Sequence, residues 1–515
     1  MSSVATHASA LHRSTIPDGL RRAAMKYRGR TALTFAGRTW SFTEIDAAAG
    51  RVAHRLAGLG LKKGDRVGAY AKNSDAYLML WLGCVRVGLV HVPINYALTA
   101  GELAYILDQS GAKALFHDPD LGETVDAVRK TAKIAHYGLI RGGAGDILSM
   151  ALDANAPRID ESDCVDGDPA QFCYTSGTTA APKAAVMSHR AYVAEYLACA
   201  IEMEFSGSDI ALAALPLYHT AQMHAFTMPQ MMVGAVTHLI ESPAPDVVLE
   251  LIERLKITSF FAPPTVWISL LRHPDFEKRD LRTLRNIYYG ASIMPVPVLQ
   301  ELRQKLPGVR FYNCYGQTEI APLATILKPE EHDDRPASAG RPIITVQTRV
   351  VDEDMKDCPP GVHGEIVHRS PQLLEEYYNK PDETAEAFVG GWFHSGDVGY
   401  FDDEGYLFVV DRVKDIIKSG GVVVAGREVE EALFKHPSVS EVAVVGLPDP
   451  KWIEAVTAMV VLKPGHEPDE AGLIAHAREI LAPFKVPKKV IYVPNLPRNT
   501  AGKLLKRQLR TEYAG

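Results

Sequence analysis

The stretch YTSGTTAAPK, residues 174–183, combines hydroxyl side chains, a glycine and a lysine, which are groups that suit a bound phosphate. Small residues let the backbone approach closely, and their N–H and O–H groups can surround phosphate oxygens. Pro182 and Ala184 flank the lysine, which excludes a Walker A loop, because that loop reads GxxxxGK[ST]. A surface loop rich in serine and threonine is the alternative interpretation. The residues expected to contact phosphate are Thr175, Ser176, Gly177, Thr178, Thr179 and Lys183.

A second pattern, YGQTE at residues 315–319, could bind the rest of a nucleotide. Its tyrosine and glycine can hold an adenine ring between them, and the oxygens of Thr318 and Glu319 can bind a Mg²⁺ ion that carries phosphate. This pattern and YYGAS, residues 288–292, could each be only a tight turn after a strand. The nucleotide-binding residues expected from YGQTE are Tyr315, Gly316 and Gln317.

Two residues further along the chain could recognise a ribose. Asp397, in WFHSGD, offers two carboxylate oxygens to a pair of hydroxyl groups, and Arg412 could assist nearby. Asp397 could instead cap a turn, because GDxGY is a good turn sequence in its own right.

In this order the motifs resemble those of the adenylate-forming superfamily, which contains acyl-CoA synthetases, luciferases and nonribosomal peptide adenylation domains. The resemblance extends from about Pro17 to Arg510, and Ala180 stands where the phosphate loop of the family usually has glycine. It implies a ligase that uses ATP to turn a carboxylic acid into an acyl-adenylate, with release of pyrophosphate. The acyl group then passes to coenzyme A with release of AMP. ATP, Mg²⁺ and CoA are the implied cofactors and co-substrates.

The resemblance also implies roles for single residues. Glu319 holds the metal with the aid of Thr175, and Thr318 contacts the α-phosphate. Asp397 binds the ribose hydroxyls, and Arg412 binds the ribose or a phosphate. YYGAS matches the segment that lines the adenine and acyl sites of the family, so the nucleotide-binding residues implied there are Gly290, Ala291 and Ser292.

Near the C-terminus, PRNTAGK at 497–503 is by itself a turn before a basic helix. The resemblance identifies Lys503 as the catalytic lysine of adenylation. Attack of a carboxylate on the α-phosphate builds negative charge at a pentacovalent phosphorus, and a lysine there stabilises that state over the ground state. The resemblance also implies that the domain carrying Lys503 rotates about a hinge at Lys414 between adenylation and thioester formation. Without it, DRVKD at 411–415 is merely an exposed turn.

A glycine loop follows the hinge. Ser419, Gly420 and Gly421 match the loop that borders the pantetheine channel in related ligases. Many relatives have an acidic residue and then asparagine after this glycine pair, whereas this chain has Val422 and Val423. We expect this difference to affect the thiol step more than adenylation.

The resemblance assigns the acyl pocket to residues 216–226, 263–267 and 290–294, with His219 near the substrate carboxylate. His219 could otherwise be a packing residue. Methionines such as Met223 indicate an adaptable apolar tunnel, so we expect a medium- or long-chain fatty acid. The alternatives are an aromatic acid of the benzoate or cinnamate type, transfer to the phosphopantetheine of a carrier protein, and luciferase-type oxidation.

Strands and helices, predicted from short apolar runs that alternate with helical patterns, must position these motifs. Strands expected at 66–72 and 89–95 enclose a helix at 74–88, a βαβα order that predicts parallel sheets covered by helices. Short antiparallel strands follow residue 340. We predict an α/β protein with a large N-terminal domain of parallel-rich αβα layers and a small β-barrel-like part, then a small, mobile α+β lid domain. The predicted boundaries are 1–410 for the nucleotide- and acyl-binding domain, 411–415 for the hinge and 416–515 for the lid.

Composition narrows the class of protein. A chain of 515 residues is too long for one core, and a net charge of −7 gives no sign of a nucleic-acid partner. Six scattered cysteines without a CxxC or Cys/His cluster indicate reduced thiols. The two longest apolar stretches are interrupted by Arg86, Pro216 and Pro229, which argues against a membrane span. We expect a cytoplasmic enzyme with small-molecule partners, for which a homodimer would be unsurprising.

Overall fold

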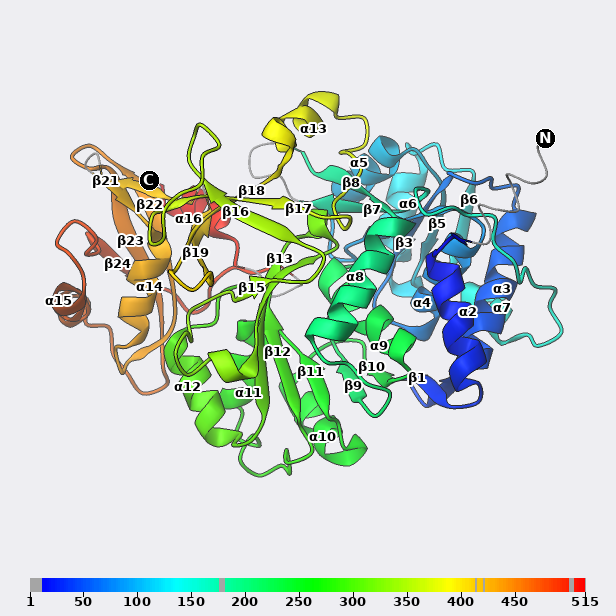
Figure 1. Cartoon of the computed structure of the whole chain (residues 1–515), viewed down its shortest axis with the longest axis horizontal. Coiled ribbons are helices and arrows are strands. Elements are labelled where there is room, and N and C mark those ends of the chain that lie inside the picture. Colours follow the sequence, from blue (N-terminus) through cyan, green and yellow to red (C-terminus); the bar gives the residue numbers. More distant parts are fainter. Residues whose placement is uncertain (1–11, 176–180, 413–414, 420–421, 500–503, 515) are drawn as a thin grey trace.

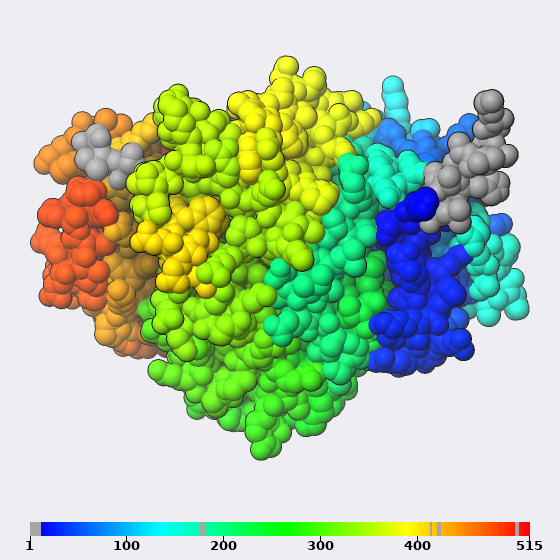
Figure 2. Space-filling view, viewed as in Figure 1, coloured from blue at the N-terminus to red at the C-terminus, as the bar shows by residue number. Residues whose placement is uncertain are grey.

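The structure is a computed structural model, and it describes residues 12–175, 181–412, 415–419, 422–499 and 504–514. Figure 1 shows an elongated molecule whose N-terminal residues, in blue, and C-terminal residues, in red, lie at opposite ends. The described strands form four sheets. The C-terminal sheet and its helices, coloured orange to red, gather at one end of the molecule (Figure 2).

The first sheet has six strands in the order β6-β5-β3-β4-β7-β8, and only β7 and β8 pair antiparallel. α4 (Asp75–Arg86) joins β3 to β4, and α5 (Ala100–Ser110) joins β4 to β5, which confirms the predicted βαβα order. The strands are β3 (Arg66–Tyr70), β4 (Val90–Ile94), β5 (Ala112–His117), β6 (His136–Leu139), β7 (Pro169–Thr175) and β8 (Lys183–Ser188).

The second sheet has nine strands in the order β15-β14-β13-β12-β11-β9-β10-β1-β2. The run from β1 through β10, β9, β11 and β12 to β13 is parallel, and the edges are antiparallel. The strands are β1 (Thr31–Phe35), β2 (Arg38–Ser41), β9 (Ile210–Ala213), β10 (Val236–Leu239), β11 (Ser259–Phe261), β12 (Asn286–Gly290), β13 (Arg310–Gly316), β14 (Leu323–Leu327) and β15 (Arg341–Pro342).

Helices fill the space between these two sheets. Every residue of α4 is buried, as expected of a helix that is apolar on all sides. Its one buried carboxylate, Asp75, is paired with the guanidinium of Arg38 and accepts a hydrogen bond from Trp40. The other helices of this half are α2 (Ile16–Tyr27), α3 (Phe42–Gly58), α6 (Gly122–Arg129), α7 (Ile147–Leu152), α8 (His189–Glu202), the π-helix η2 (Ala221–Thr227), α9 (Met228–Val233), α10 (Pro245–Leu255), α11 (Pro264–Arg272) and α12 (Val296–Lys305).

Two smaller sheets complete the fold. The antiparallel sheet of β16 (Gln347–Val351), β17 (Gly364–Arg369), β18 (Phe393–Phe401) and β19 (Leu407–Arg412) follows α12 and the second sheet in sequence. The last sheet contains β20 (Ile417–Ser419), β21 (Val422–Val424), β22 (Val439–Asp449), β23 (Ile453–Leu462) and β24 (Lys489–Tyr492). Its helices, and the one between β17 and β18, are α13 (Pro381–Ala387), α14 (Gly426–Phe434), α15 (Glu470–Ile480) and α16 (Lys506–Tyr513).

This arrangement confirms the predicted fold class, a large domain of parallel sheets and a smaller C-terminal domain. All six cysteines are free, and five of them are buried. In the described part of the chain, no helix combines the length and the apolar character needed to cross a membrane.

Candidate active site

Three strand ends bring the predicted motifs together. β13 ends at Gly316, inside YGQTE, and β12, its parallel neighbour, ends at Gly290, with Gly290 paired to Cys314. β7 ends at Thr175, where the hydroxyl-rich stretch begins. Because ligands of open α/β sheets bind beyond the carboxyl ends of the strands, these ends define the candidate site.

Close backbone packing explains two of its glycines. A Cβ atom on Gly316 would lie 1.8 Å from the carbonyl oxygen of Pro322, and one on Gly290 would lie 2.1 Å from that of Cys314. Ordinary Cβ contacts are never this short, so any side chain would push the neighbouring backbone away. Ala291, which follows Gly290, adopts a left-handed φ of 61°.

The predicted ribose residues lie in contact with YGQTE. The Tyr315 hydroxyl donates a hydrogen bond of 2.8 Å to Oδ2 of Asp397, and Arg412 Nε lies 3.3 Å from Oδ1 of the same carboxylate. Asp397 lies within β18 and pairs with Arg412 of β19, so it does not cap a turn. Burial, followed by the Asp397 charge, raises the pKa of Tyr315, which keeps the phenol protonated.

A second group of contacts surrounds Glu319. The Tyr377 hydroxyl donates a hydrogen bond of 3.1 Å to Oε1 of Glu319, and Lys183 Nζ lies 4.2 Å from the centroid of the Tyr377 ring. Lys183 begins β8 directly opposite Thr175 at the end of β7. Lys183 and Glu319, which were predicted from separate motifs, are therefore linked through Tyr377, which was not predicted.

Thr318 lies beside the segment that contains His219. Its hydroxyl is 3.3 Å from that of Thr220, so the predicted α-phosphate residue and the predicted acyl segment meet. His219 is partly exposed and precedes η2, and its Nδ1 accepts a hydrogen bond of 3.5 Å from the Ala221 amide. A π-helix at this position is notable because such turns are frequent at functional sites.

A buried carboxyl group supports the backbone behind YGQTE. Glu195 of α8 is fully buried, and its Oε1 accepts a hydrogen bond of 3.0 Å from the Leu323 amide. Gln372 donates to Oε2 of Glu195 and to the carbonyl oxygens of Ile320 and Leu323, at 3.2 and 3.0 Å for the carbonyls. Burial raises the pKa of Glu195 to about 8. Nothing in the local sequence of these residues indicates this role.

Several predicted residues lie outside the described part of the chain. Of the three residues predicted in the glycine loop, the structure describes Ser419, which ends β20 and has a buried side chain. The predicted residues that lie outside the described part are Ser176, Gly177, Thr178, Thr179, Lys414, Gly420, Gly421 and Lys503.

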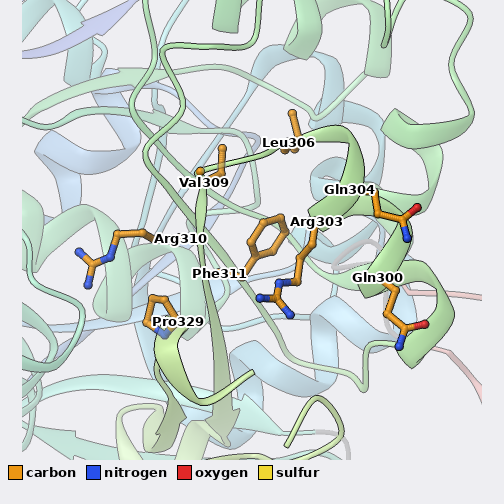
Figure 3. Close-up of a pocket in the computed structure, with 9 residues that line it drawn as sticks. Gln300, Arg303, Gln304, Leu306, Val309, Arg310, Phe311 and Pro329 are labelled. Atoms are coloured by element: carbon orange, nitrogen blue, oxygen red, sulfur yellow. The ribbon is translucent and has the colours of Figure 1, made fainter. Parts of the chain in front are cut away.

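A surface cavity of about 550 Å³ lies elsewhere (Figure 3). It is lined by Arg310 and Phe311, which begin β13, whereas YGQTE ends that strand. At about 3.3 Å per residue, the cavity lies roughly 20 Å from the candidate site. Its two arginines are already paired, Arg303 with Asp333 at 2.7 Å and Arg310 with Glu204 at 2.8 Å. It is not part of the candidate active site.

Comparison with known proteins decides the family. Residues 20–378 match the AMP-binding enzyme family, and residues 428–503 match the family of AMP-binding enzyme C-terminal domains. The chain belongs to the AMP-binding enzyme family. This confirms the adenylate-forming superfamily predicted from the motifs, and the chain is an AMP-forming acid–thiol ligase.

Relatives in this family act on different acids. The chain is similar to a feruloyl-CoA synthase of Amycolatopsis sp., with 35% identity over 96% of this chain and 98% of the relative. It is also similar to the long-chain-fatty-acid–CoA ligase FadD13 of Mycobacterium tuberculosis, with 34% identity over 92% of this chain and 93% of the relative. Among solved structures, ATP-bound MatB from Rhodopseudomonas palustris has a TM-score of 0.90 and 32% identity, over 97% of this chain and 99% of that one.

Proposed function

We propose that this AMP-binding enzyme is an acyl-CoA synthetase that adenylates a medium- or long-chain fatty acid and transfers the acyl group to CoA. The observation that supports the proposal is that one segment, 315–319, contacts both the residue predicted to bind the ribose and the residues predicted to lie near the phosphates. Tyr315 holds Asp397 on the ribose side, and Glu319 is held by Tyr377 next to Lys183 on the phosphate side.

In the proposed reaction, Asp397 binds the ribose, and Lys183 and Thr318 face the phosphates. The carboxylate of the acid attacks the α-phosphorus, the bond to the β-phosphate breaks, and pyrophosphate leaves. The thiol of CoA then attacks the acyl carbonyl, and AMP leaves. Lys183 and Lys503 supply positive charge where the charge of the transition state develops.

The proposed Mg²⁺ ligands are Glu319 and Thr175. One carboxylate and one hydroxyl fit this ion, because Mg²⁺ is commonly bound by one or two carboxylates together with substrate phosphates and water. Among the described residues there is no cluster of three His, Cys, Asp or Glu side chains that could enclose a metal, so ATP would provide several of the ligands. A bound Mg²⁺ would neutralise charge on the phosphate oxygens.

The proposed hinge at 411–415 joins two separate sheets. β19 ends at Arg412 in the third sheet, and β20 begins at Ile417 in the fourth. α16, which follows Lys503, is tied to this segment by an ion pair of 2.8 Å between Arg510 and Asp415. The lid domain, which carries the proposed catalytic lysine, therefore contacts the hinge about which it would rotate.

The apolar character of the three predicted pocket segments supports an apolar acyl group. Met223, Phe226, Trp267 and Met294, from the three predicted pocket segments, are each no more than 3% exposed. An aromatic acid is the second candidate, because the Phe226 ring stacks on Phe261 with centroids 4.1 Å apart, and a flat acyl group packs well against such a pair. The similarity to a feruloyl-CoA synthase also supports it.

Pyrophosphate release across a panel of fatty, aromatic and amino acids, each with and without CoA, tests the proposal. CoA-stimulated turnover on fatty acids is the expected result, and the same stimulation on aromatic acids would support the second candidate. Release of about one equivalent that does not respond to CoA would contradict the CoA step and indicate a carrier-protein acceptor.

A further inference from the structure

We infer that Tyr377 is a positioning residue that fixes the metal-binding carboxylate of Glu319 and the phosphate-binding amine of Lys183 in one geometry. The inference rests on the proposed function, which assigns those two groups to metal and phosphate. Tyr377 itself stands in LLEEYYNKP, outside every motif recognised in the sequence.

The hydroxyl group of Tyr377 orients Glu319. It donates to Oε1 at 3.1 Å, and the described residues give no hydrogen bond to Oε2, which remains available to a metal ion. Tyr377 is 6% exposed and Glu319 is 8% exposed, so little water competes for this contact. A phenol is protonated at neutral pH, so the hydroxyl of Tyr377 is a donor to this carboxylate. Partners of this kind, which orient a metal-binding carboxylate, commonly affect metal affinity about 10–100-fold.

The ring of the same residue positions Lys183. The ammonium lies 4.2 Å from the ring centroid, within the range of a cation–π contact. Because the hydroxyl and the ring face are rigidly joined, a movement of one contact moves the other. Glu319 and Lys183 are thereby held at opposite parts of one planar side chain.

The backbone around Tyr377 is fixed on both sides. Residues 374–378 lie between β8 and the segment that contains Glu319, and Tyr377 forms a β-bridge with Ala185. Four backbone hydrogen bonds fix this segment: Val186 N to Glu376 O at 2.9 Å, Glu375 N to Val186 O at 2.9 Å, Tyr378 N to Ala184 O at 2.9 Å, and Leu374 N to Glu319 O at 2.8 Å. The side chain therefore starts from a fixed backbone position, which a positioning role requires.

Tyr377→Phe separates the two contacts, because it removes the hydroxyl and keeps the ring. Tyr378→Phe is the matched control: the Tyr378 ring packs at a tilt against Phe172, with centroids 4.6 Å apart, and within the described residues it contacts neither Glu319 nor Lys183. Tyr377→Leu removes both contacts and serves as a second variant.

Mn²⁺ binding is measured by electron paramagnetic resonance with α,β-methylene-ATP present, and binding of this analogue is also measured in EDTA. We expect Tyr377→Phe to weaken Mn²⁺ binding about tenfold and to leave metal-free nucleotide binding within twofold. Tyr378→Phe should change neither, and Tyr377→Leu should weaken both. Thermal melting of each variant monitors folding.

Equal Mn²⁺ affinity in wild type and Tyr377→Phe would overturn the inference while leaving the proposed function intact. Equal weakening by Tyr377→Phe and Tyr378→Phe would overturn it too, because it would indicate a general packing defect. A wild-type protein that binds neither the nucleotide nor Mn²⁺ would refute the proposed function itself, and with it the inference.

Discussion

Replacing Asp397 with asparagine tests the ribose assignment most directly. Asp397 is 5% exposed. One of its carboxylate oxygens accepts a hydrogen bond from Tyr315, and the other forms an ion pair with Arg412. A carboxylate has about four acceptor positions, so two remain for ribose hydroxyls. In asparagine one oxygen becomes an NH₂ donor. If the NH₂ group faces Arg412, the contact with that guanidinium is lost. If the NH₂ group faces Tyr315, it cannot accept the hydrogen bond from the tyrosine hydroxyl.

The expected loss of ATP affinity follows from the hydrogen bonds between this carboxylate and the ribose hydroxyls. One bond to a charged acceptor contributes about 1.5–3 kcal/mol, and the amide keeps at most one of the two ribose contacts. We therefore expect Asp397→Asn to raise the dissociation constant of ATP about 10–100-fold. The KM of the carboxylic acid should stay within about twofold, because this carboxylate faces the nucleotide.

Calorimetric titration with α,β-methylene-ATP measures this binding without turnover. Asp402→Asn is the matched control: Asp402 also pairs with an arginine, Arg335, at 2.9 Å, but in the turn that follows β18. An unchanged nucleotide affinity in Asp397→Asn would refute the ribose assignment. Equal losses in both variants would refute the argument from local contacts.

Three further predictions address the rest of the site. Gly316→Ala should lower the melting temperature and weaken ATP binding, because its Cβ would lie 1.8 Å from a backbone oxygen, and normal melting would contradict the close packing. The contribution of buried Glu195 to the stability of the protein should fall as pH rises from 4.5 to 8, because Glu195, with a pKa of about 8, keeps a proton that the unfolded chain releases near 4.5. Urea unfolding of Glu195→Gln across this range should lack that part of the slope, and an identical slope would exclude Glu195 as its source. Lys503→Ala should slow adenylation about 10²–10³-fold but spare thioester formation from supplied acyl-AMP, and equal loss of both half-reactions would count against a lysine that serves adenylation alone.

Much of the fold could be read from local patterns. The strands expected at 66–72 and 89–95 are β3 and β4, and the helix between them is α4. The short antiparallel strands expected after residue 340 are present as β16 to β19. The sequence did not show that β20 pairs with β23, because this contact joins Ser419 to the distant Ile453.

The sequence by itself determined the family and the chemical character of the site. The family and this chemical character can be read from the residue types in short motifs and from the order of the motifs, because a phosphate, a ribose and a metal ion each require particular donors and acceptors at close spacing. Asp397 and Tyr315 were both recognised in this way, although 82 residues separate them.

Only the tertiary structure decided which residues hold those motifs in place. Tyr377 reaches Glu319 across 58 residues, and Gln372 reaches Glu195 across 177. A tyrosine in a loop, or a glutamate inside a helix, has no local pattern that names its partner. The partner is fixed by long-range strand pairing and burial, which bring these groups together where water is excluded and a single hydrogen bond can determine the position of a side chain.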